Sequence, residues 1–191
     1  MAITAFSAPP VVSPGDKLNI NYANNAIRAS LVHLRDVNQS WCQLRYIAPN
    51  GVGGGTALAN NWVRRPLNQH LGNAANFVGL DVPSSRFTLQ PGVWHLRAAA
   101  ATHYSGDSKL RLYNVSDGMV QDISMSGGVS SLSALPLILE TRFGIASSKV
   151  FQLELWCSKT QEVTGMGKPS NSGQNELYTI ITLDLEGGYS G

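Results

Sequence analysis

The chain has 191 residues, and its 14 Lys and Arg against 12 Asp and Glu leave a formal net charge of +2. Only 14% of the residues are charged, so the sequence offers no large basic field and we expect no nucleic-acid partner. This length fits one domain with a short appendage, and the 19 glycines and nine prolines favour short strands joined by turns.

The first 38 residues are predicted to attach or trimerise the protein. Residues 1–17 carry Pro9, Pro10 and Pro14 without a sustained period, which indicates an extended arm. This segment has no positively charged start followed by an apolar run, so it does not resemble a secretory signal. No later run approaches the roughly 20 apolar residues that span a bilayer. We therefore expect an unsecreted protein, made in a cytoplasm, with no membrane partner.

A change of period marks one short amphipathic helix between about Asn19 and Asp36. Its apolar residues recur at spacings of three and four: Ile20, Ala23, Ile27, Leu31 and Leu34. A helix this short is marginal alone in water, so its apolar stripe needs a partner. The partner is either the protein's own β-domain or the same helix in neighbouring subunits. The seven-residue spacing of Ile20, Ile27 and Leu34 favours the second.

Short strands are expected after this helix. Trp41 to Ala48 alternates loosely, and residues 60–68 and 76–82 supply two more strands. The run from Gly53 to Gly55 is not followed by Gly-Lys-Ser/Thr, so we interpret it as a mobile surface loop rather than a phosphate cradle. Adjacent strand residues point to opposite faces, so one of Arg64 and Arg65 is expected to pair with a carboxylate while the other is solvated.

The stretch from Ser84 to Asp122 shows the clearest alternation. Phe87 and Leu89 precede the turn Gln90-Pro91-Gly92. A longer strand follows, in which these apolar residues alternate with the residues between them: Trp94, Leu96, Ala98 and Ala100. After Ser105-Gly106-Asp107, Leu110 and Leu112 repeat the pattern. Period two puts every second side chain on one face, so the stretch predicts three consecutive antiparallel strands.

The remaining segments complete a predicted all-β sandwich over residues 39–191. Residues 119–126 form a strand and 127–133 a flexible loop. Residues 134–145 form a strand in which Pro136 indicates either an edge position or the first residues of the strand. Strands over 149–159 and 176–186 follow. One set of residues is expected to face the core: Phe151, Leu153, Leu155 and Cys157. Two further sets are each expected to share one face of a strand: Leu135, Leu137 and Leu139, and Leu177, Thr179, Ile181, Leu183 and Leu185. About eight to ten strands fit an antiparallel jelly-roll sandwich.

The loop over residues 160–175 is long and polar, and such loops are often functional. We take it as the candidate distal binding loop. Its candidate contact residues are Lys168, Asn171 and Gln174.

No catalytic constellation stands out. The four histidines are scattered along the chain: His33, His70, His95 and His103. No serine lies in a Gly-x-Ser-x-Gly turn, and no Cys/His spacing would hold zinc. We therefore expect a protein that is not an enzyme and has no cofactor.

Three aspartates and two cysteines have alternative interpretations. Asp107, Asp117 and Asp122 lie near turns, where calcium binding competes with the ordinary preference of Asp for turns. We favour the second interpretation and predict no metal site. Cys42 and Cys157 allow at most one intrachain disulfide, and we favour two buried thiols that behave as small hydrophobic side chains.

Three motifs follow one another along the chain: Asn61-Trp62-Val63-Arg64-Arg65-Pro66-Leu67-Asn68, the run from Phe87 to Gly118, and Glu176-Leu177-Tyr178-Thr179. Together, over roughly residues 42–186, they resemble bacteriophage virion proteins with a C1q/TNF-like jelly-roll domain. The resemblance implies a head that associates as a threefold homotrimer. It makes four aromatic residues candidates for the subunit interface, with sugar stacking or filling of the sandwich as alternatives: Trp62, Trp94, Tyr113 and Trp156.

The resemblance leaves two non-enzymatic functions open. In the first, the protein is a homotrimeric short tail fibre whose head binds a host-surface glycan or protein. In the second, it is a capsid decoration (cement) protein that clamps and stabilises the major capsid protein. A helix ahead of the head favours the fibre, and the lack of shaft repeats favours decoration. Both functions place the protein in the virion, next to baseplate or tail proteins or the major capsid protein, and the fibre is our working hypothesis.

Overall fold

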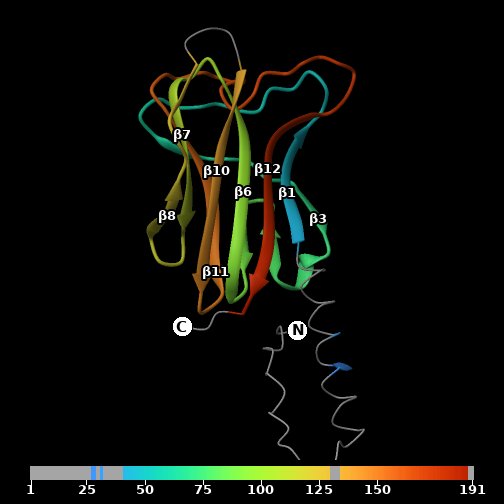
Figure 1. The fold of residues 1–191 in the computed structure, drawn as a ribbon. Coiled ribbons are helices and arrows are strands. Elements are labelled where there is room, and N and C mark those ends of the chain that lie inside the picture. The colour runs from blue at the N-terminus through green and yellow to red at the C-terminus, as the bar shows by residue number, and fades with distance from the viewer. Residues whose placement is uncertain (1–26, 29–30, 32–40, 130–133, 189–191) are drawn as a thin grey trace, which may run out of the picture.

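Two antiparallel β-sheets face each other across one hydrophobic core (Figure 1). The computed structural model describes residues 27–28, 31, 41–129 and 134–188. The five-stranded sheet contains, in spatial order, β10 (Ala134–Ile145), β6 (Gly92–His103), β12 (Glu176–Gly187), β1 (Trp41–Ala48) and β3 (Gln69–Gly72). The 3₁₀ helix η1 (Ala74–Asn76) follows β3.

The second sheet has seven strands. Five of them follow in spatial order: β4 (Val78–Asp81), β5 (Arg86–Leu89), β11 (Lys149–Cys157), β7 (Gly106–Asn114) and β8 (Met119–Ile123). Two short strands pair beside them, namely β2 (Trp62–Arg64) with β11 and β9 (Gly127–Val129) with β7. The predicted all-β antiparallel jelly-roll sandwich is confirmed, with short strands such as β3 and β9 in addition to those that the sequence pattern indicated.

Period-two alternation places one apolar face of each long strand in the core. The buried sets are Trp94, Leu96, Ala98 and Ala100 on β6, and Phe151, Leu153, Leu155 and Cys157 on β11. The core-facing set of β11 is the one that was predicted. Phe151 stacks with Phe87 of its own sheet and Phe143 of the other, at ring-centroid distances of 5.9 and 5.4 Å. Burying one large apolar side chain contributes roughly 1.5–3 kcal/mol, so this layer holds the sheets together.

The consecutive strands β5, β6 and β7 do not pair with one another, so the predicted row of three strands is wrong. β6 pairs with β10 and β12, whereas β5 and β7 both pair with β11 in the other sheet. The turn Gln90-Pro91 and the bend at Tyr104-Ser105 therefore carry the chain from sheet to sheet. Alternation fixes which side chains are buried, but it carries no information about which strand lies beside which.

Two smaller expectations differ from the structure. Gly127 to Val129, expected in a flexible loop, forms β9. Leu177 was expected to share a face with Thr179, but it is 48% exposed whereas Thr179 is buried, because the β1–β12 register shifts between Tyr46 and Ile47 and the alternation breaks there. Leu135 is 43% exposed, because it pairs near the end of β6.

The ends of the sandwich differ in character. The chain enters at Trp41, which pairs with Asp184 of β12, and β12 ends at Gly187. Both points lie away from the long loops that gather at the top of Figure 1. Of the predicted helix, Ile27, Arg28 and Leu31 have helical backbone, whereas Ile20, Ala23 and Leu34 lie outside the described residues. The boundary between residues 1–38 and 39–191 remains a prediction.

Candidate functional site

Two long segments form one end of the sandwich, which we call the loop end: residues 49–61 between β1 and β2, and residues 158–175 between β11 and β12. Their backbones bind each other directly. Gly54 N donates to Gly167 O at 2.8 Å, Gly55 N to Val163 O at 2.8 Å, and Ala57 and Gln161 exchange two hydrogen bonds. The loop end is therefore a two-segment ribbon rather than two independent loops.

The glycine run is part of this ribbon, so its interpretation as a mobile surface loop is wrong. A Cβ added at Gly54 would lie 2.4 Å from Met166 O, and one at Gly53 would lie 2.4 Å from Val163 O. Only glycine allows the two backbones to approach this closely. The run serves packing between segments about a hundred positions apart in sequence, which no local pattern reveals.

Arg65 lies beneath the loop end with no exposed surface. Its guanidinium donates to the carbonyl oxygens of Ala101 (3.0 Å), Met166 (2.9 Å) and Tyr178 (2.8 Å), and to Thr179 Oγ1 (3.0 Å). These groups belong to β6, to the 158–175 segment and to β12. Arg65 therefore ties the ribbon to the five-stranded sheet.

The expected pairing of one arginine with a carboxylate is wrong for this pair. Arg65 binds carbonyl and hydroxyl oxygens, and Arg64 is exposed. Burial lowers the pKa of Arg65 to about 9, so the group remains charged at neutral pH. Period-two alternation places Val63 and Arg65 on the same, inward side of the chain. This alternation is the sequence signal that could have identified Arg65 as buried.

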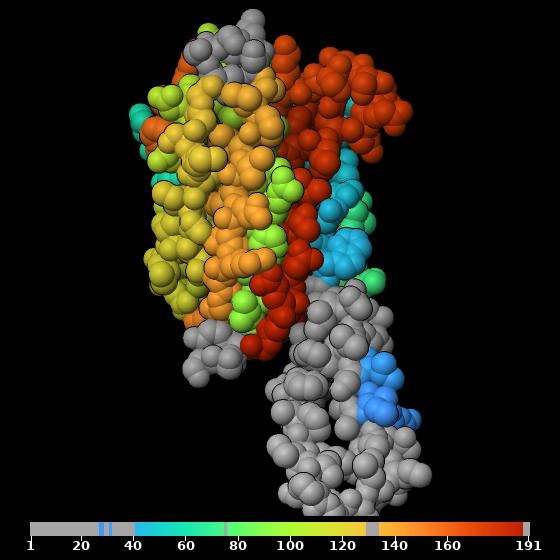
Figure 2. All heavy atoms as spheres, in the orientation of Figure 1, coloured from blue at the N-terminus to red at the C-terminus, as the bar shows by residue number. Residues whose placement is uncertain are grey.

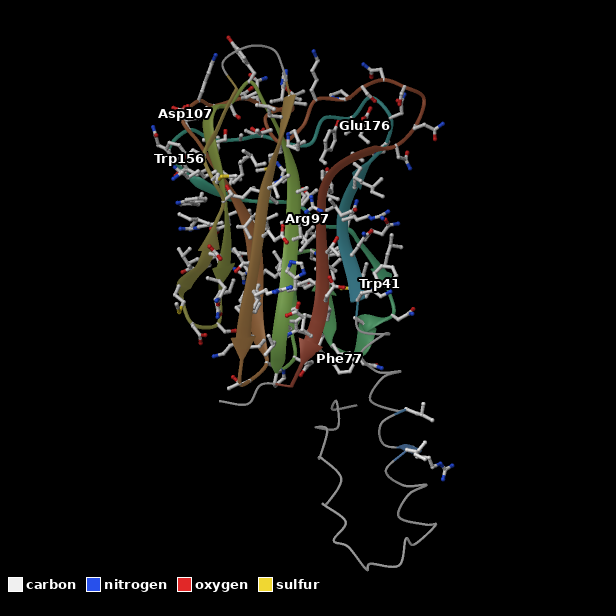
Figure 3. The ribbon with its side chains drawn as sticks, viewed as in Figure 1. Trp41, Phe77, Arg97, Asp107, Trp156 and Glu176 are labelled. Atoms are coloured by element: carbon white, nitrogen blue, oxygen red, sulfur yellow. The ribbon has the colours of Figure 1, made fainter. Side chains whose placement is uncertain are left out.

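The tip of the 158–175 segment carries the candidate binding residues Lys168, Asn171 and Gln174, and all three are exposed. The buried carboxylate of Glu176 anchors this tip by accepting from Ser170 N at 2.8 Å and Asn171 N at 3.2 Å. Figure 3 shows Glu176 below this tip. The candidate residues therefore lie on a segment that hydrogen bonds to Glu176 fix in place. Their contact with a partner remains a prediction.

The loop end also exposes large apolar side chains. Val52, Leu58 and Val163 are 46%, 45% and 64% exposed. Tyr178 Oη donates to Val52 O at 2.7 Å, and burial, aided by Glu176 and Tyr46, raises the pKa of Tyr178 to about 12. This tyrosine therefore stays protonated and keeps the segment fixed. Apolar side chains held open on an ordered ribbon are typical of a surface that contacts another molecule.

A second apolar surface follows one side of the sandwich, where β8 and β10 lie side by side (Figure 2, yellow and orange). We call it the β8/β10 edge. Its exposed members are Met119, Val120, Ile123, Leu135 and Ile138, at 40–53%. Both strands end their sheets, so among the described strands none pairs with their outer sides.

The outer face of the five-stranded sheet, here called the flat face, presents small and apolar side chains beside charged ones. Ala99 of β6 lies opposite Ile138 on one side and Ile180 on the other. Farther along β6, His95 Nε2 lies 2.9 Å from Glu140 Oε1 and its Nδ1 lies 3.9 Å from Asp184 Oδ2. The flat face therefore combines small, apolar and charged side chains.

The four candidate interface aromatics divide into two groups. Trp94 is wrong as an interface residue, because it has no exposed surface and lies in the core with its Nε1 bonded to Gln90 O at 3.0 Å. Trp62, Tyr113 and Trp156 lie half-buried on the outer face of the seven-stranded sheet. Their contact with another subunit remains a prediction.

Among the described residues no group of three or more His, Cys, Asp and Glu could hold a metal ion. Asp117 binds Lys149 at 2.5 Å, and Asp122 accepts from the backbone of Ile123. Cys42 and Cys157 are free and buried, as favoured. Within the part of the chain that the structure covers, no helix is long and apolar enough to cross a membrane.

No protein-family model matches this chain, and no curated protein matches its sequence. The solved globular domain of zebrafish complement 1qA protein is similar, with a TM-score of 0.52 and 17% sequence identity over 79% of this chain and 99% of that chain. The fold is a C1q/TNF-like jelly roll. Two structures of murine APRIL, at pH 5.0 and pH 8.0, match with TM-scores of 0.45 at 10% and 8% identity, over 76% of this chain and 99% of each of those chains. The C1q/TNF-like part of the predicted resemblance is confirmed, and its bacteriophage part remains a prediction.

Proposed function

We propose that this protein is a non-enzymatic, homotrimeric virion protein of a bacteriophage, in which the jelly-roll head is attached at one end and binds at the other. The observation that carries the proposal is the polarity of the head. The chain enters at Trp41 and β12 leaves at Gly187, away from the loop end. The loop end presents Val52, Leu58 and Val163 on an ordered ribbon.

Two different apolar surfaces on one chain support the trimer. The two surfaces meet at Ile138, but the edge is formed mainly by Met119, Val120 and Ile123 of β8 in the seven-stranded sheet, whereas the flat face belongs to the five-stranded sheet. Contact of the edge of one copy with the flat face of the next is a heterologous interface, which closes into a ring when the rotation allows. Three copies joined in this way would cover both surfaces on every copy.

The working hypothesis for the binding end is a short tail fibre that contacts a host-surface protein or glycan through the loop end. Exposed Lys168, Asn171 and Gln174 supply polar contacts beside the apolar side chains. The alternative is capsid decoration, in which the same end docks on the major capsid protein. The apolar character of the loop end supports this alternative, because exposed apolar patches are typical of protein–protein contacts.

Localisation of the protein on intact particles tests the proposal. Antibody-gold labelling and imaging of particles that lack the protein would give density at the tail tip for a fibre. Density spread over the capsid would identify a decoration protein instead. A particle that carries no copy of this protein would contradict both forms of the proposal.

A further inference from the structure

The outer face of the seven-stranded sheet holds a two-by-three array of side chains across β2, β11 and β7, which we call the Trp/Arg grid. One row contains Trp62, Trp156 and Lys109, and the next contains Arg64, Glu154 and Arg111. Directly paired residues on neighbouring strands share a face and lie about 4.5–5.5 Å apart at their Cβ atoms. Trp156 lies at the margin of the sandwich in Figure 3, well separated from Arg97 on the flat face.

Arg111 is fixed within this grid on three sides. Its guanidinium carbon lies 4.3 Å from the ring centroid of Trp62 and 4.9 Å from that of Tyr113. Its Nε donates to Glu154 Oε2. Two aromatic rings and one carboxylate therefore hold the arginine in place, and its two terminal nitrogens are not needed for these contacts.

The single carboxylate of the grid is already occupied. The Glu154 side chain is 8% exposed, and its second oxygen accepts from Gln152 Nε2 at 2.6 Å. The next carboxylate along β7, Asp107, lies against Gly128 of β9, on the side of β7 away from β11. Three cations, Arg64, Lys109 and Arg111, thus surround two indole rings with one neutralised acid between them.

We propose that the Trp/Arg grid is a binding site for an acidic saccharide, meaning a pyranose ring that carries a carboxylate. The flat apolar face of an indole suits the C–H face of a sugar ring. A guanidinium suits a carboxylate, which it binds through two parallel hydrogen bonds. Arg111 already covers one face of Trp62. An acidic peptide would engage the cations and leave the Trp156 indole unused, whereas a sugar acid uses both the cations and this indole. The site lies on neither the flat face nor the loop end, so it does not depend on the proposed virion role.

Calorimetric titration of the full chain with matched sugar pairs tests the site. The pairs are trigalacturonate with its trimethyl ester, and sialyllactose with lactose, so that each pair differs in its carboxylate. At least one acidic member is expected to bind, its neutral partner at least about tenfold more weakly, and binding is expected to weaken with added salt. Equal affinity within the pair, or no binding of either acid at millimolar concentration, would overturn the proposal.

Variants locate the binding on the grid. Arg64→Gln changes an exposed side chain and is expected to weaken binding roughly five- to tenfold. Trp156→Ala is expected to weaken it at least as much, with circular dichroism as the check on folding. The control for the lost cation is Lys149→Gln, because Lys149 lies on β11 and is already paired with Asp117. The control for the lost indole is Trp41→Ala, because Trp41 lies on the other sheet. Unchanged affinity in Arg64→Gln, or equal losses in the controls, would reject the grid as the site. So would a poly-glutamate peptide that binds as tightly and is insensitive to Trp156→Ala.

Discussion

Arg65 has no exposed surface and draws its hydrogen bonds from three separate segments of the chain. A buried guanidinium is costly to desolvate, and here carbonyl oxygens and Thr179 Oγ1 offset that cost. Loss of Arg65 would remove its hydrogen bonds to all of these buried oxygens. A single side chain therefore attaches the loop end to the rest of the sandwich.

Replacing Arg65 tests this role. Arg65→Met is expected to lower the free energy of unfolding by about 3–5 kcal/mol, because it leaves buried carbonyls unsatisfied. Urea denaturation measures the change. Arg64→Met, on the exposed neighbouring position, is the control and is expected to change stability by less than about 0.5 kcal/mol. Similar losses in the two variants would show that burial of Arg65 is unimportant.

The two thiols give a pH prediction. Burial, with a smaller effect of Asp184, raises the pKa of Cys42 from its ordinary value of 9.0 to about 12. Between these values the unfolded chain loses the proton while the folded chain keeps it. Stability is therefore expected to fall as pH rises above 9, by about 1.4 kcal/mol per pH unit for this group.

Alkylation checks the same assignment at constant pH. Cys42 and Cys157 have 0% and 1% exposed surface, so iodoacetamide at pH 8 is expected to modify neither in the folded protein and both in urea. Mass spectrometry counts the adducts. Rapid modification of the folded protein would contradict their burial.

At the scale of the elements, the contact between the two loop-end segments rests on glycine. Gly54→Ala places a methyl group 2.4 Å from Met166 O and is expected to cost about 1–3 kcal/mol, since the two backbones must separate. Gly187→Ala is the matched control, because a Cβ there meets nothing within 4 Å. Thermal denaturation of both variants measures the difference. Equal melting temperatures would show that the two loop-end backbones can separate without loss of stability.

The predicted helix carries two exposed apolar side chains among its described residues. Ile27 and Leu31 are 58% and 60% exposed within one chain, which leaves them available to a partner. If this helix is a trimer seam, Ile27→Asp is expected to yield monomers in light scattering with unchanged β-type circular dichroism. A trimer that survives the substitution would leave the helix to another role.

The strands were far more predictable from the sequence than their pairing. Alternation located β6, β10 and β11 to within a few residues and identified their buried faces, because burial of one face dictates period two. It could not show that β6 lies between β10 and β12, since sheet partners are chosen by contacts between distant segments. β9 was missed because Gly127 and Gly128 have no side chains to alternate.

The candidate site was predictable only in part. Exposure of Lys168, Asn171 and Gln174 follows from a polar loop, and the core position of Trp94 follows from the same alternation that identified its strand. The Trp/Arg grid was not predictable, because β2, β11 and β7 are brought together by topology alone. Three of the four proposed interface aromatics lie on that outer face or beside it.

At the scale of the whole molecule, the edge-to-face contact makes a specific prediction about mixtures. Ile123→Glu on the β8/β10 edge and Ile180→Glu on the flat face are each expected to be monomeric, because a buried glutamate would lack a partner. The wild-type chain is expected at three times its 20.5 kDa mass. When the two variants are mixed, the intact edge of the Ile180→Glu chain can bind the intact flat face of the Ile123→Glu chain. A heterodimer is therefore expected.

Analytical ultracentrifugation measures these masses. Leu58→Glu, which changes an exposed side chain of the loop end, is the control and is expected to remain trimeric. A mixture that stays monomeric would contradict the heterologous contact. A wild-type chain that sediments at its own mass would contradict the trimer itself.

The pairing of Trp41 with Asp184 also has a practical consequence. The first residue of β1 and the last of β12, Gly187, lie near the same end of the sandwich, so a short linker could join them and the chain could be opened elsewhere. The same geometry makes the sandwich suitable for insertion into a surface loop of an unrelated carrier protein. Inserted in this way, the sandwich would point its loop end away from the carrier, where the loop end could bind a partner.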